Sequence, residues 1–580
     1  MKTYFSIENL RIAWERCRRD TNRDIKDYAG MDLFEVDLDN NLNNLSEILL
    51  SKRYKPCRPA KFYEPKPSGT LRSKTILCIE DALVYQCIID TIAARSYEDS
   101  LPYESFVFGS VLNEEVSKGV NLLKEDNPKY FFFEMWMDKW AQFAESVNKE
   151  IEDLSITYKL ETDITGFFDC IPHSKLLLTI YQKYDIDKSV VDILAECLNM
   201  WSGTADSATP GIGIPQGPQA SFFLGNLYLL DMDYILVKKG LSYYRYMDDI
   251  RIYSSDKAEL NKVLVDIDKH LKSNGLSINS KKTLIEPISE NREEEKLNIS
   301  DLLFYLNEVK NEMGLKEGKG ESKNLNIKKK VEFYDLDITE QFGPVSESDF
   351  EKGSDFYFNS KEEADEYLQK QLKEVKEVIN ARIEFKKNGV SFKNEMEIDQ
   401  NIRGFQKEWL KIGYDYRSIL KLSKVMELGY NPDIELIDVW LIAADKFFSK
   451  ANQFNWILIK YPCDNKLKKK LMAIIEKSSL YEWVQYQYII TLAVTQKLTL
   501  EELRKYFKQL SLTSSFYLKL GLYRLLILQA DSGHQLYATI IHSIKSEKDT
   551  FLKSTLLYYI DKKNKGILTK YDIAQTIGLI

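Results

Sequence analysis

The sequence predicts an α+β fold with an antiparallel sheet, followed by an all-α region of HEAT-like helical repeats. Two observations support this prediction. Short β-like runs alternate with helical segments over residues 155–285, and two of these runs form a hairpin between residues 241 and 254. From residue 361 to 580, amphipathic segments follow one another with short polar breaks, which is typical of packed helix pairs. They share no repeated signature, so an irregular helical bundle is the alternative.

Length and composition limit the class of protein. The 580 residues suffice for two to four domains, and the 44% apolar content excludes wholesale disorder. Four His and seven scattered Cys, without a CxxC pair, argue against a multi-His zinc site or an HNH-type nuclease module. They favour a reduced, cytoplasmic setting. The chain shows no apolar run of about 18 residues and no signal peptide, so we expect no membrane partner.

The charge distribution is more informative than the total. The net charge is −8, yet residues 51–75 contain eight Lys or Arg and only one acid, Glu64. Prolines and a glycine interrupt this stretch, so it is not a simple basic helix. The segment includes Lys66 and Arg72 and could hold a polyanionic ligand. A solvated basic hairpin is the alternative.

Four regions follow from these patterns. Residues 1–120 contain helices and the basic segment, and residues 121–300 contain the sheet. An aromatic-rich stretch, residues 129–150, looks like a helix inserted before the first strand of the sheet. Residues 301–360 are charged and dotted with glycine, which suggests a linker or a solvated loop, and residues 361–580 form the helical region.

Three segments, in order, indicate the chemistry. A β-like run ends at Asp163, a Gly/Pro-rich turn lies within residues 211–221, and Asp248 and Asp249 sit at the tip of the hairpin within residues 243–250. Carboxylates on adjacent strands can bind two divalent cations roughly 3.5–4 Å apart and so support phosphoryl transfer. Alone, the Asp pair would be a surface turn and Asp163 a helix N-cap. Their combination favours the catalytic interpretation.

These motifs resemble the palm of reverse transcriptases. The resemblance rests on Tyr246-Met-Asp-Asp249, on Asp163 followed five residues later by Phe168, and on Pro215-Gln216-Gly217. Residues 65–72, with Ile76 and Asp81, are similar to the fingers motif of group II intron and retron enzymes, and residues 275–283 resemble their motif D. The resemblance covers about residues 50–285. It implies a right-hand polymerase with fingers within residues 1–120 and a palm in residues 121–300, whose motifs are 163–169, 211–221, 243–250 and 275–283.

The resemblance also implies roles for individual residues. Asp163, Asp248 and Asp249 would be catalytic and, with the Ile164 carbonyl, would hold two Mg²⁺ or Mn²⁺ ions. The nucleotide-binding residues would be Lys66 and Arg72 at the triphosphate, Phe168 as a steric gate, Gln216 beside the nascent base pair and Lys282 as a proton donor to pyrophosphate. RNA-dependent RNA polymerases have an acid where Phe168 stands, so the resemblance favours deoxynucleotides. The enzyme class implied is an RNA-directed DNA polymerase, a nucleotidyltransferase.

The helical second half narrows the resemblance. Without a maturase, HNH or zinc-binding segment, the chain looks most like bacterial defence-associated reverse transcriptases of the abortive-infection and "unknown group" lineage. Its members are similar in making DNA during antiphage defence, several of them by priming on a protein hydroxyl without a conventional template. The implied partners are dNTPs, DNA or RNA and further copies of the chain, with a companion non-coding RNA or protein left open.

Two other functions compete with this one. A retron- or intron-type enzyme would copy RNA, and a non-catalytic nucleic-acid sensor would use a retired palm. The intact set of three aspartates argues against the sensor. Aromatic and basic residues share helices between residues 483 and 524, where they could form a stacking surface for single-stranded nucleic acid. The interpretation that we favour places these rings in the helical core.

Overall fold

The computed structural model describes part of the chain as two compact units. The described residues are 1–19, 27–66, 69–204, 207–297, 448, 451–452, 458–459, 464–476, 481–570 and 573. One unit contains residues 1–62 and 73–297, and the other contains residues 63–72 together with the described residues from 448 onward. The expected linker, residues 301–360, and the beginning of the helical region lie outside the described residues.

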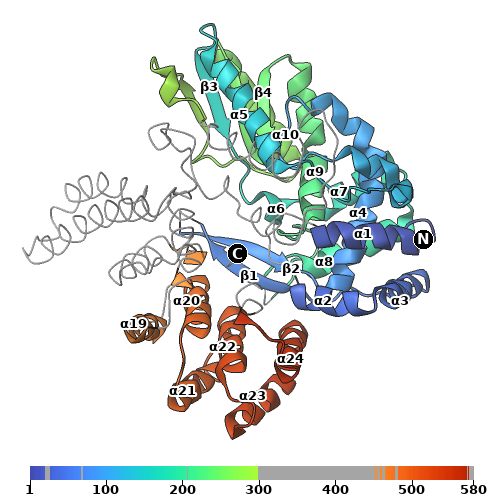
Figure 1. The fold of residues 1–580 in the computed structure, drawn as a ribbon. Coiled ribbons are helices and arrows are strands. Elements are labelled where there is room, and N and C mark those ends of the chain that lie inside the picture. The colour runs from blue at the N-terminus through green and yellow to red at the C-terminus, as the bar shows by residue number, and fades with distance from the viewer. Residues whose placement is uncertain are drawn as a thin grey trace, which may run out of the picture. The chain divides into compact units, whose positions relative to one another are not determined.

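Helices make up the first part of the larger unit (Figure 1). They are α1 (Ile7–Arg19), α2 (Tyr28–Val36), α3 (Leu38–Leu50) and α4 (Ile79–Ser100). The apolar residues of α1 recur at helical spacing, and the helix buries Leu10, Ala13 and Trp14. α4 is buried over most of its length and packs on α1, α8 (Lys188–Trp201) and α9 (Gln219–Lys238). It is therefore the central helix of this unit.

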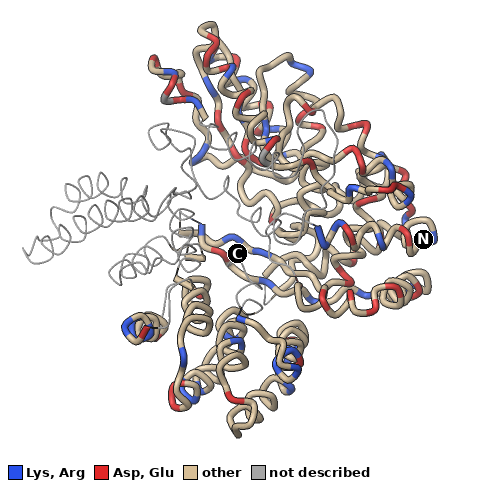
Figure 2. The backbone as a smooth tube through the Cα atoms, viewed as in Figure 1, with Lys and Arg blue, Asp and Glu red and all other residues tan. Residues whose placement is uncertain are grey.

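The basic segment folds into a two-stranded hairpin, β1 (Ala60–Pro65) and β2 (Leu71–Ile76). Gly69 has a φ of +86°, which the turn between the strands requires and which glycine adopts without strain. Several of the Lys and Arg positions of the chain lie along this hairpin (Figure 2). The boundary between the two units passes through it, since residues 63–72 belong to the smaller unit. The short 3₁₀ helices η1 (Leu101–Tyr103) and η2 (Glu114–Lys124) follow α4.

The predicted antiparallel sheet is confirmed. Its four strands have the spatial order β4-β5-β3-β6, with β3 at Tyr158–Thr162, β4 at Ser242–Tyr246, β5 at Asp249–Ser254 and β6 at Leu284–Pro287. β3 pairs with both β5 and β6, and Leu160 faces Ile252 on one side and Ile285 on the other. β3, the strand that ends at Asp163, is thus an interior strand with both neighbours antiparallel to it.

Helices cover both faces of this sheet. Side chains alternate along a strand, so Ile252 packs into the main core while Tyr253 packs into a separate cluster on the other face. α10 (Lys257–Ser273) buries Leu260, Val263 and Ile267 in the main core, and α5 (Trp136–Glu152) contributes Phe143 and Val147 to the second cluster. The aromatic stretch at 129–150 therefore supplies one layer of the sheet domain, although the helix itself begins only at Trp136.

Three further helices connect β3 to the β4–β5 hairpin: α6 (Phe167–Cys170), α7 (His173–Lys183) and α8; α9 then leads into β4. By length and hydropathy alone, α9 is long and apolar enough to cross a membrane, the one such helix among the described residues. However, 56% of its most apolar window is buried inside the fold. The core helix of a globular domain can be equally long and apolar, and α9 packs on α4 and α6.

The smaller unit is helical in its described residues after 464. Its helices are α19 (Asn465–Glu476), α20 (Glu482–Thr495), α21 (Leu500–Leu510), α22 (Phe516–Gln529), α23 (Gln535–Lys545) and α24 (Thr550–Asn564). α20, α22 and α24 pack in a row, and each also packs on the helix that precedes it. α21 begins with a capping box between Thr499 and Glu502, which satisfies two free backbone N–H groups. Helix pairs were predicted here, and assignment to a HEAT-like family stays a prediction.

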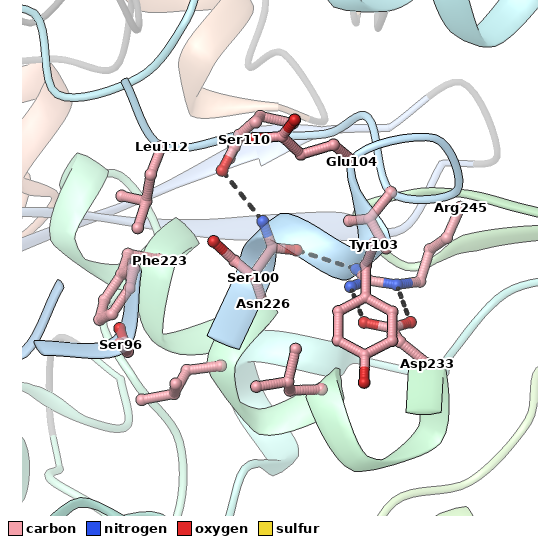
Figure 3. A pocket seen from close by; sticks show the side chains of 14 residues that line it. Ser96, Ser100, Tyr103, Glu104, Ser110, Leu112, Phe223, Asn226, Asp233 and Arg245 are labelled. Atoms are coloured by element: carbon pink, nitrogen blue, oxygen red, sulfur yellow. Dashed lines mark hydrogen bonds and ion pairs between the residues drawn. The ribbon is translucent and has the colours of Figure 1, made fainter. Parts of the chain in front are cut away.

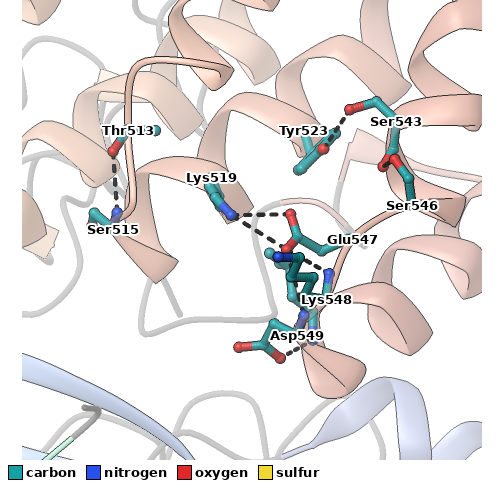
Figure 4. A network of polar contacts seen from close by, with 10 residues as sticks. Thr513, Ser515, Lys519, Tyr523, Ser543, Ser546, Glu547, Lys548 and Asp549 are labelled. Atoms are coloured by element: carbon teal, nitrogen blue, oxygen red, sulfur yellow. Dashed lines mark hydrogen bonds and ion pairs between the residues drawn. The ribbon is translucent and has the colours of Figure 1, made fainter.

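Polar contacts tie these helices together. Arg524 of α22 is buried and donates hydrogen bonds to the hydroxyls of Tyr486 (2.9 Å) and Tyr559 (3.1 Å). Figure 4 shows a second network, in which Lys519 of α22 forms a 3.1 Å ion pair with Glu547 in the loop before α24. The rings that could have formed a stacking surface, including Trp483, Tyr486 and Tyr517, are buried instead. The core interpretation of the aromatic residues holds for these positions.

Candidate active site

Asp163 lies at the end of the interior strand β3 and is held by the segment after α10. Its backbone carbonyl accepts a hydrogen bond from the Asn279 N–H (2.9 Å), and Thr165 N donates to the Ser277 carbonyl (2.9 Å). Ile164 forms an isolated bridge with Ile278. The structure thus brings the segment at 275–283 alongside Asp163.

The two other acids lie on the adjacent hairpin. β4 and β5 join through a two-residue turn of Met247 and Asp248, and Asp249 is the first residue of β5, paired with Tyr246. Thr162 faces Ile250 in the β3–β5 register, so continuing that register by one residue places Asp163 opposite Asp249. The predicted hairpin tip is confirmed, and one of its two acids, Asp249, is a cross-strand neighbour of Asp163.

The electrostatics of this corner favour a cation. Asp163 has a side chain that is only 15% exposed, and its Oδ1 is buried without a hydrogen-bond partner among the described residues. Desolvation raises the pKa of Asp249, and the Glu161 and Asp163 carboxylates raise it further, whereas Arg251 and Lys282 lower it. Like charges directly across a sheet destabilise it. An unpartnered carboxylate oxygen beside other carboxylates has the donor chemistry that Mg²⁺ prefers, so these residues fit a divalent metal.

Lys282 contributes the positive charge nearest to Asp163. Its ammonium group is ion-paired with Asp163 Oδ2, although the Lys282 side chain is 68% exposed. Lys281 is also exposed, but only Lys282 makes this contact among the described residues. The ammonium group therefore occupies one carboxylate oxygen and leaves the other, Oδ1, without a partner. The role predicted for Lys282, proton donor to pyrophosphate, stays a prediction.

Arg245 holds the backbone of the turn that carries Asp248 in place. Met247 has a φ of +53°, an unfavourable conformation for a side chain of this size. Arg245 Nη1 donates to the Met247 carbonyl (2.7 Å) and to Asn226 Oδ1 (2.9 Å), and the Arg245 guanidinium pairs with Asp233 (2.7 Å). Figure 3 shows Arg245, Asp233 and Asn226 lining a pocket beside this turn. Both charged side chains are 1% exposed.

A backbone segment completes the support of the turn. Phe108 N donates to the Arg245 carbonyl (2.9 Å) and Asn226 Nδ2 donates to the Gly109 carbonyl (2.7 Å). A Cβ atom at Gly109 would lie 2.5 Å from the Met247 nitrogen, so only glycine fits there. This tight approach joins the segment before η2 to the turn that carries Asp248.

Phe168 lies in α6, directly after the β3 strand end. It is 8% exposed, and its ring makes edge contacts with Phe167 and Phe222, both with ring centres 5.3 Å away. Its carbonyl accepts a hydrogen bond from Ile214 N (2.8 Å), which joins the Asp163 motif to the Gly/Pro-rich turn. The Phe168 ring is therefore buried against two other rings, and its backbone is joined to the Gly/Pro-rich turn.

Gln216 is placed by the same turn. Its carbonyl accepts a hydrogen bond from Thr75 N of β2 (2.8 Å), and both residues belong to the larger unit. The following Gly217 has a φ of +140°, a backbone conformation that disfavours other residues. Gln216 is half-buried beside the base of the hairpin.

Lys66 and Arg72 lie near the tip of the hairpin, in the smaller unit. The Lys66 carbonyl accepts from Gly69 N (2.8 Å) and Lys66 N donates to the Thr70 carbonyl (2.7 Å), which closes the turn. Arg72 lies 4.0 Å from Glu64 on the opposite strand. Because residues 63–72 are grouped apart from the sheet domain, the structure does not place these two cations relative to the aspartates.

Lys61 is a candidate site residue that the sequence analysis did not single out. It lies on β1 within the larger unit and is 7% exposed. Burial lowers its pKa to about 8, and the Asp169 carboxylate, one residue after Phe168, acts in the opposite direction. The sequence offered one signal, the run of eight cations, but nothing in that run distinguished a buried lysine from its exposed neighbours.

One comparison with known proteins covers the residues of this site. Residues 110–297 match the family described as reverse transcriptase (RNA-dependent DNA polymerase), a range that contains all three aspartates, Phe168, Gln216 and Lys282. No curated protein matches the chain. The hairpin with Lys66 and Arg72 lies outside the matched range.

Solved structures with partial similarity include telomerases. Apo telomerase from Candida tropicalis, truncated from the C-terminal domain, is 16% identical over 43% of this chain and 56% of that chain, with a TM-score of 0.27. The same enzyme in complex with the TWJ fragment of telomeric RNA is 13% identical over 72% and 68%, and the Candida albicans complex is 10% identical over 85% and 65%, both with a TM-score of 0.30. The chain thus spans little more than half of the first of these structures. Backbone overlap at these TM-scores is partial, and the family match is the comparison that bears on the site.

Proposed function

We propose that the reverse transcriptase domain of residues 110–297 is an active DNA polymerase that adds deoxynucleotides to a 3′-hydroxyl. The observation that carries this proposal is the buried, unpartnered Oδ1 of Asp163 in cross-strand register with Asp249. Asp163, Asp248 and Asp249, with the Ile164 carbonyl, would hold two Mg²⁺ or Mn²⁺ ions. Bound ions of this kind lower the pKa of the attacking hydroxyl and neutralise charge on the leaving pyrophosphate.

The residues around the aspartates would then bind and orient the nucleotide. Phe168 is held rigidly by Phe167 and Phe222, so its ring can exclude a ribose 2′-hydroxyl without moving aside. Gln216 is fixed beside β2 and would support the nascent base pair. Lys66 and Arg72 would bind the triphosphate, where guanidinium can make paired hydrogen bonds.

Lys282 has a position suited to the role proposed for it. Its ammonium group contacts Asp163 and is exposed on its other side, so it can turn toward a phosphate when the carboxylate takes up a cation. We propose that it donates a proton to the departing pyrophosphate. A neutral side chain at this position would leave Asp163 without the ion pair and would supply no proton.

We further propose that this polymerase serves antiphage defence in the bacterial cytoplasm. The support is the combination of the motif set with a second half whose described helices pack in successive pairs. Protein-primed, untemplated synthesis and assembly of several copies belong to the same proposal, as does a companion RNA or protein. A retron- or intron-like enzyme that copies RNA is the alternative, and genes next to this one would separate the two.

One experiment tests both the activity and its priming. The purified full-length protein is incubated with each labelled dNTP and Mg²⁺ or Mn²⁺, first alone and then with an RNA template and a DNA primer. Label that stays on the denatured protein without added primer would support protein priming. Label only on the added primer would support the RNA-copying alternative, and no incorporation with any combination would argue for a retired palm.

A further inference from the structure

Two cysteines and an aspartate converge at the base of the β1–β2 hairpin. Cys57 lies three residues before β1, Cys78 lies two residues after β2, and Asp81 is in the first turn of α4. One ligand atom from each residue lies within 4.8 Å of the others. The two cysteines are 21 positions apart in the sequence, so no CxxC spacing announces the cluster. All three belong to the larger unit.

Asp81 is oriented toward the sulfur atoms by a fixed set of donors. Its Oδ1 accepts from the Tyr54 hydroxyl (2.7 Å), and its Oδ2 accepts from Cys57 N (2.8 Å) and Trp201 Nε1 (3.1 Å). The Cys78 thiol also hydrogen-bonds this carboxylate. All four donors are neutral groups, so no cation compensates the charge of this 2% exposed side chain through them. A bound cation would take the place of the thiol proton.

The two thiols form an asymmetric pair beside this carboxylate. Cys57 is exposed and Cys78 is half-buried at the N-cap of α4. A hydrogen bond from the Cys78 thiol lowers the pKa of Cys57. The hydrogen bond with Cys57 and burial raise the pKa of Cys78, which keeps its proton in the absence of a cation. A cation that displaced this proton would meet three ligand atoms already within 4.8 Å of one another.

We propose that Cys57, Cys78 and Asp81 bind a thiophilic divalent cation of the Zn²⁺ class. Ligands of one tetrahedral zinc ion lie about 4 Å apart, given Zn–S bonds of about 2.3 Å, which the spacing of these atoms permits. Thiolates select such cations, whereas the all-oxygen active site suits Mg²⁺. The exposure of Cys57 leaves the fourth position to water.

A cation bound to these three residues would link the two ends of the β1–β2 hairpin. Cys57 and Cys78 flank the hairpin that carries Lys61, Lys66 and Arg72, so one ion would tie the chain entering β1 to the start of α4. Binding to the folded state alone would stabilise the protein in proportion to the logarithm of the metal concentration. The proposal is independent of whether the palm polymerises nucleotides.

The test uses Co²⁺ as a spectroscopic probe, because thiolate-to-Co²⁺ charge transfer absorbs only when sulfur ligates the ion. Reduced full-length protein is titrated anaerobically with Co²⁺ in excess Mg²⁺, and Zn²⁺ is then added. We expect the absorption to saturate at one Co²⁺ per chain and to vanish when Zn²⁺ displaces it. Cys57→Ser and Cys78→Ser should lose it, and Asp81→Asn should weaken Co²⁺ binding about 10-fold or more.

Cys17→Ser is the matched control, because Cys17 is also half-buried and its thiol donates to the Ala82 carbonyl, which serine can still do. It should keep both the absorption and a rise in unfolding temperature with Zn²⁺. Each of three results overturns the proposal. The first is no saturable absorption in the wild type, and the second is equal absorption in Cys57→Ser. The third is a protein that binds no Co²⁺ and in which hydrogen peroxide joins the two thiols in an intramolecular disulfide.

Discussion

Arg245 donates a hydrogen bond of 2.7 Å to the carbonyl of Met247, the residue that turns β4 into β5 immediately before Asp248. Met247 has a φ of +53°, which costs on the order of 1–3 kcal/mol and persists only when the surroundings enforce it. The buried guanidinium, held by Asp233, supplies that enforcement. The position of this turn therefore depends on the buried ion pair between Arg245 and Asp233.

This dependence predicts different outcomes for stability and activity. Arg245→Met leaves Asp233 buried without its partner and should lower the free energy of unfolding by about 3–5 kcal/mol. The double variant Arg245→Met, Asp233→Leu should regain most of that stability, because replacing a buried ion pair with apolar residues is often neutral. Its kcat for dNTP addition should stay low while KM for dNTP changes little. Wild-type kcat in the stable double variant would show that the anchor does not matter.

The steric-gate assignment predicts a change in sugar selectivity. Phe168→Ala removes the ring that we propose excludes the 2′-hydroxyl, so the ratio of ribonucleotide to deoxynucleotide efficiency should rise at least about 10-fold. The comparison of kcat/KM for dATP and ATP measures this ratio. Phe222→Ala, which removes only the ring packed against Phe168, is the matched control and should change the ratio much less. Equal selectivity in wild type and Phe168→Ala would assign the gate elsewhere.

Lys61 predicts a pH dependence of stability. Burial lowers its pKa from 10.5 to about 8, so the folded state loses this proton at a lower pH than the unfolded state does. Between about pH 8 and 10.5 the unfolded state binds more protons, and stability from this group rises with pH. Lys61→Met removes the cost of the buried charge. It should be more stable than wild type at pH 7, and the difference should shrink toward pH 10 in urea unfolding.

Asp169 supplies a check on this interpretation, since its carboxylate raises the pKa of Lys61. Asp169→Asn should shift the rise in stability to lower pH. A stability difference between Lys61→Met and wild type that is constant from pH 7 to pH 10 would mean that Lys61 does not titrate in this range.

Local patterns in the sequence were enough to predict the hairpin of Asp248 and Asp249. Alternating residues define β4 and β5, and the turn between them places Asp248 in the turn and Asp249 at the start of β5. The sequence also predicted a helix within residues 129–150. That this helix covers one face of the sheet could not be foreseen, because it depends on contacts such as that between Trp140 and Tyr246, whose ring centres are 5.1 Å apart.

The residues that the sequence analysis missed depend on partners from other parts of the chain. Arg245 depends on Asp233 and Asn226 from another element, and a lone Arg in a β-like run gives no sign of such partners. Cys57, Cys78 and Asp81 meet only because the hairpin folds back. Lys61 differs from Lys66 through burial alone, which a charge count cannot reveal.

The central claim is that Asp163 and Asp249 form the metal-binding centre of a DNA polymerase. The most direct measurement is Mg²⁺-dependent dNTP incorporation by Asp163→Asn and Asp249→Asn, beside Asp268→Asn on the surface of α10 as the matched control. All three should give the circular dichroism of the folded wild type. We predict that incorporation is lost in the first two variants and unchanged in the third. Wild-type incorporation by folded Asp163→Asn would contradict the account.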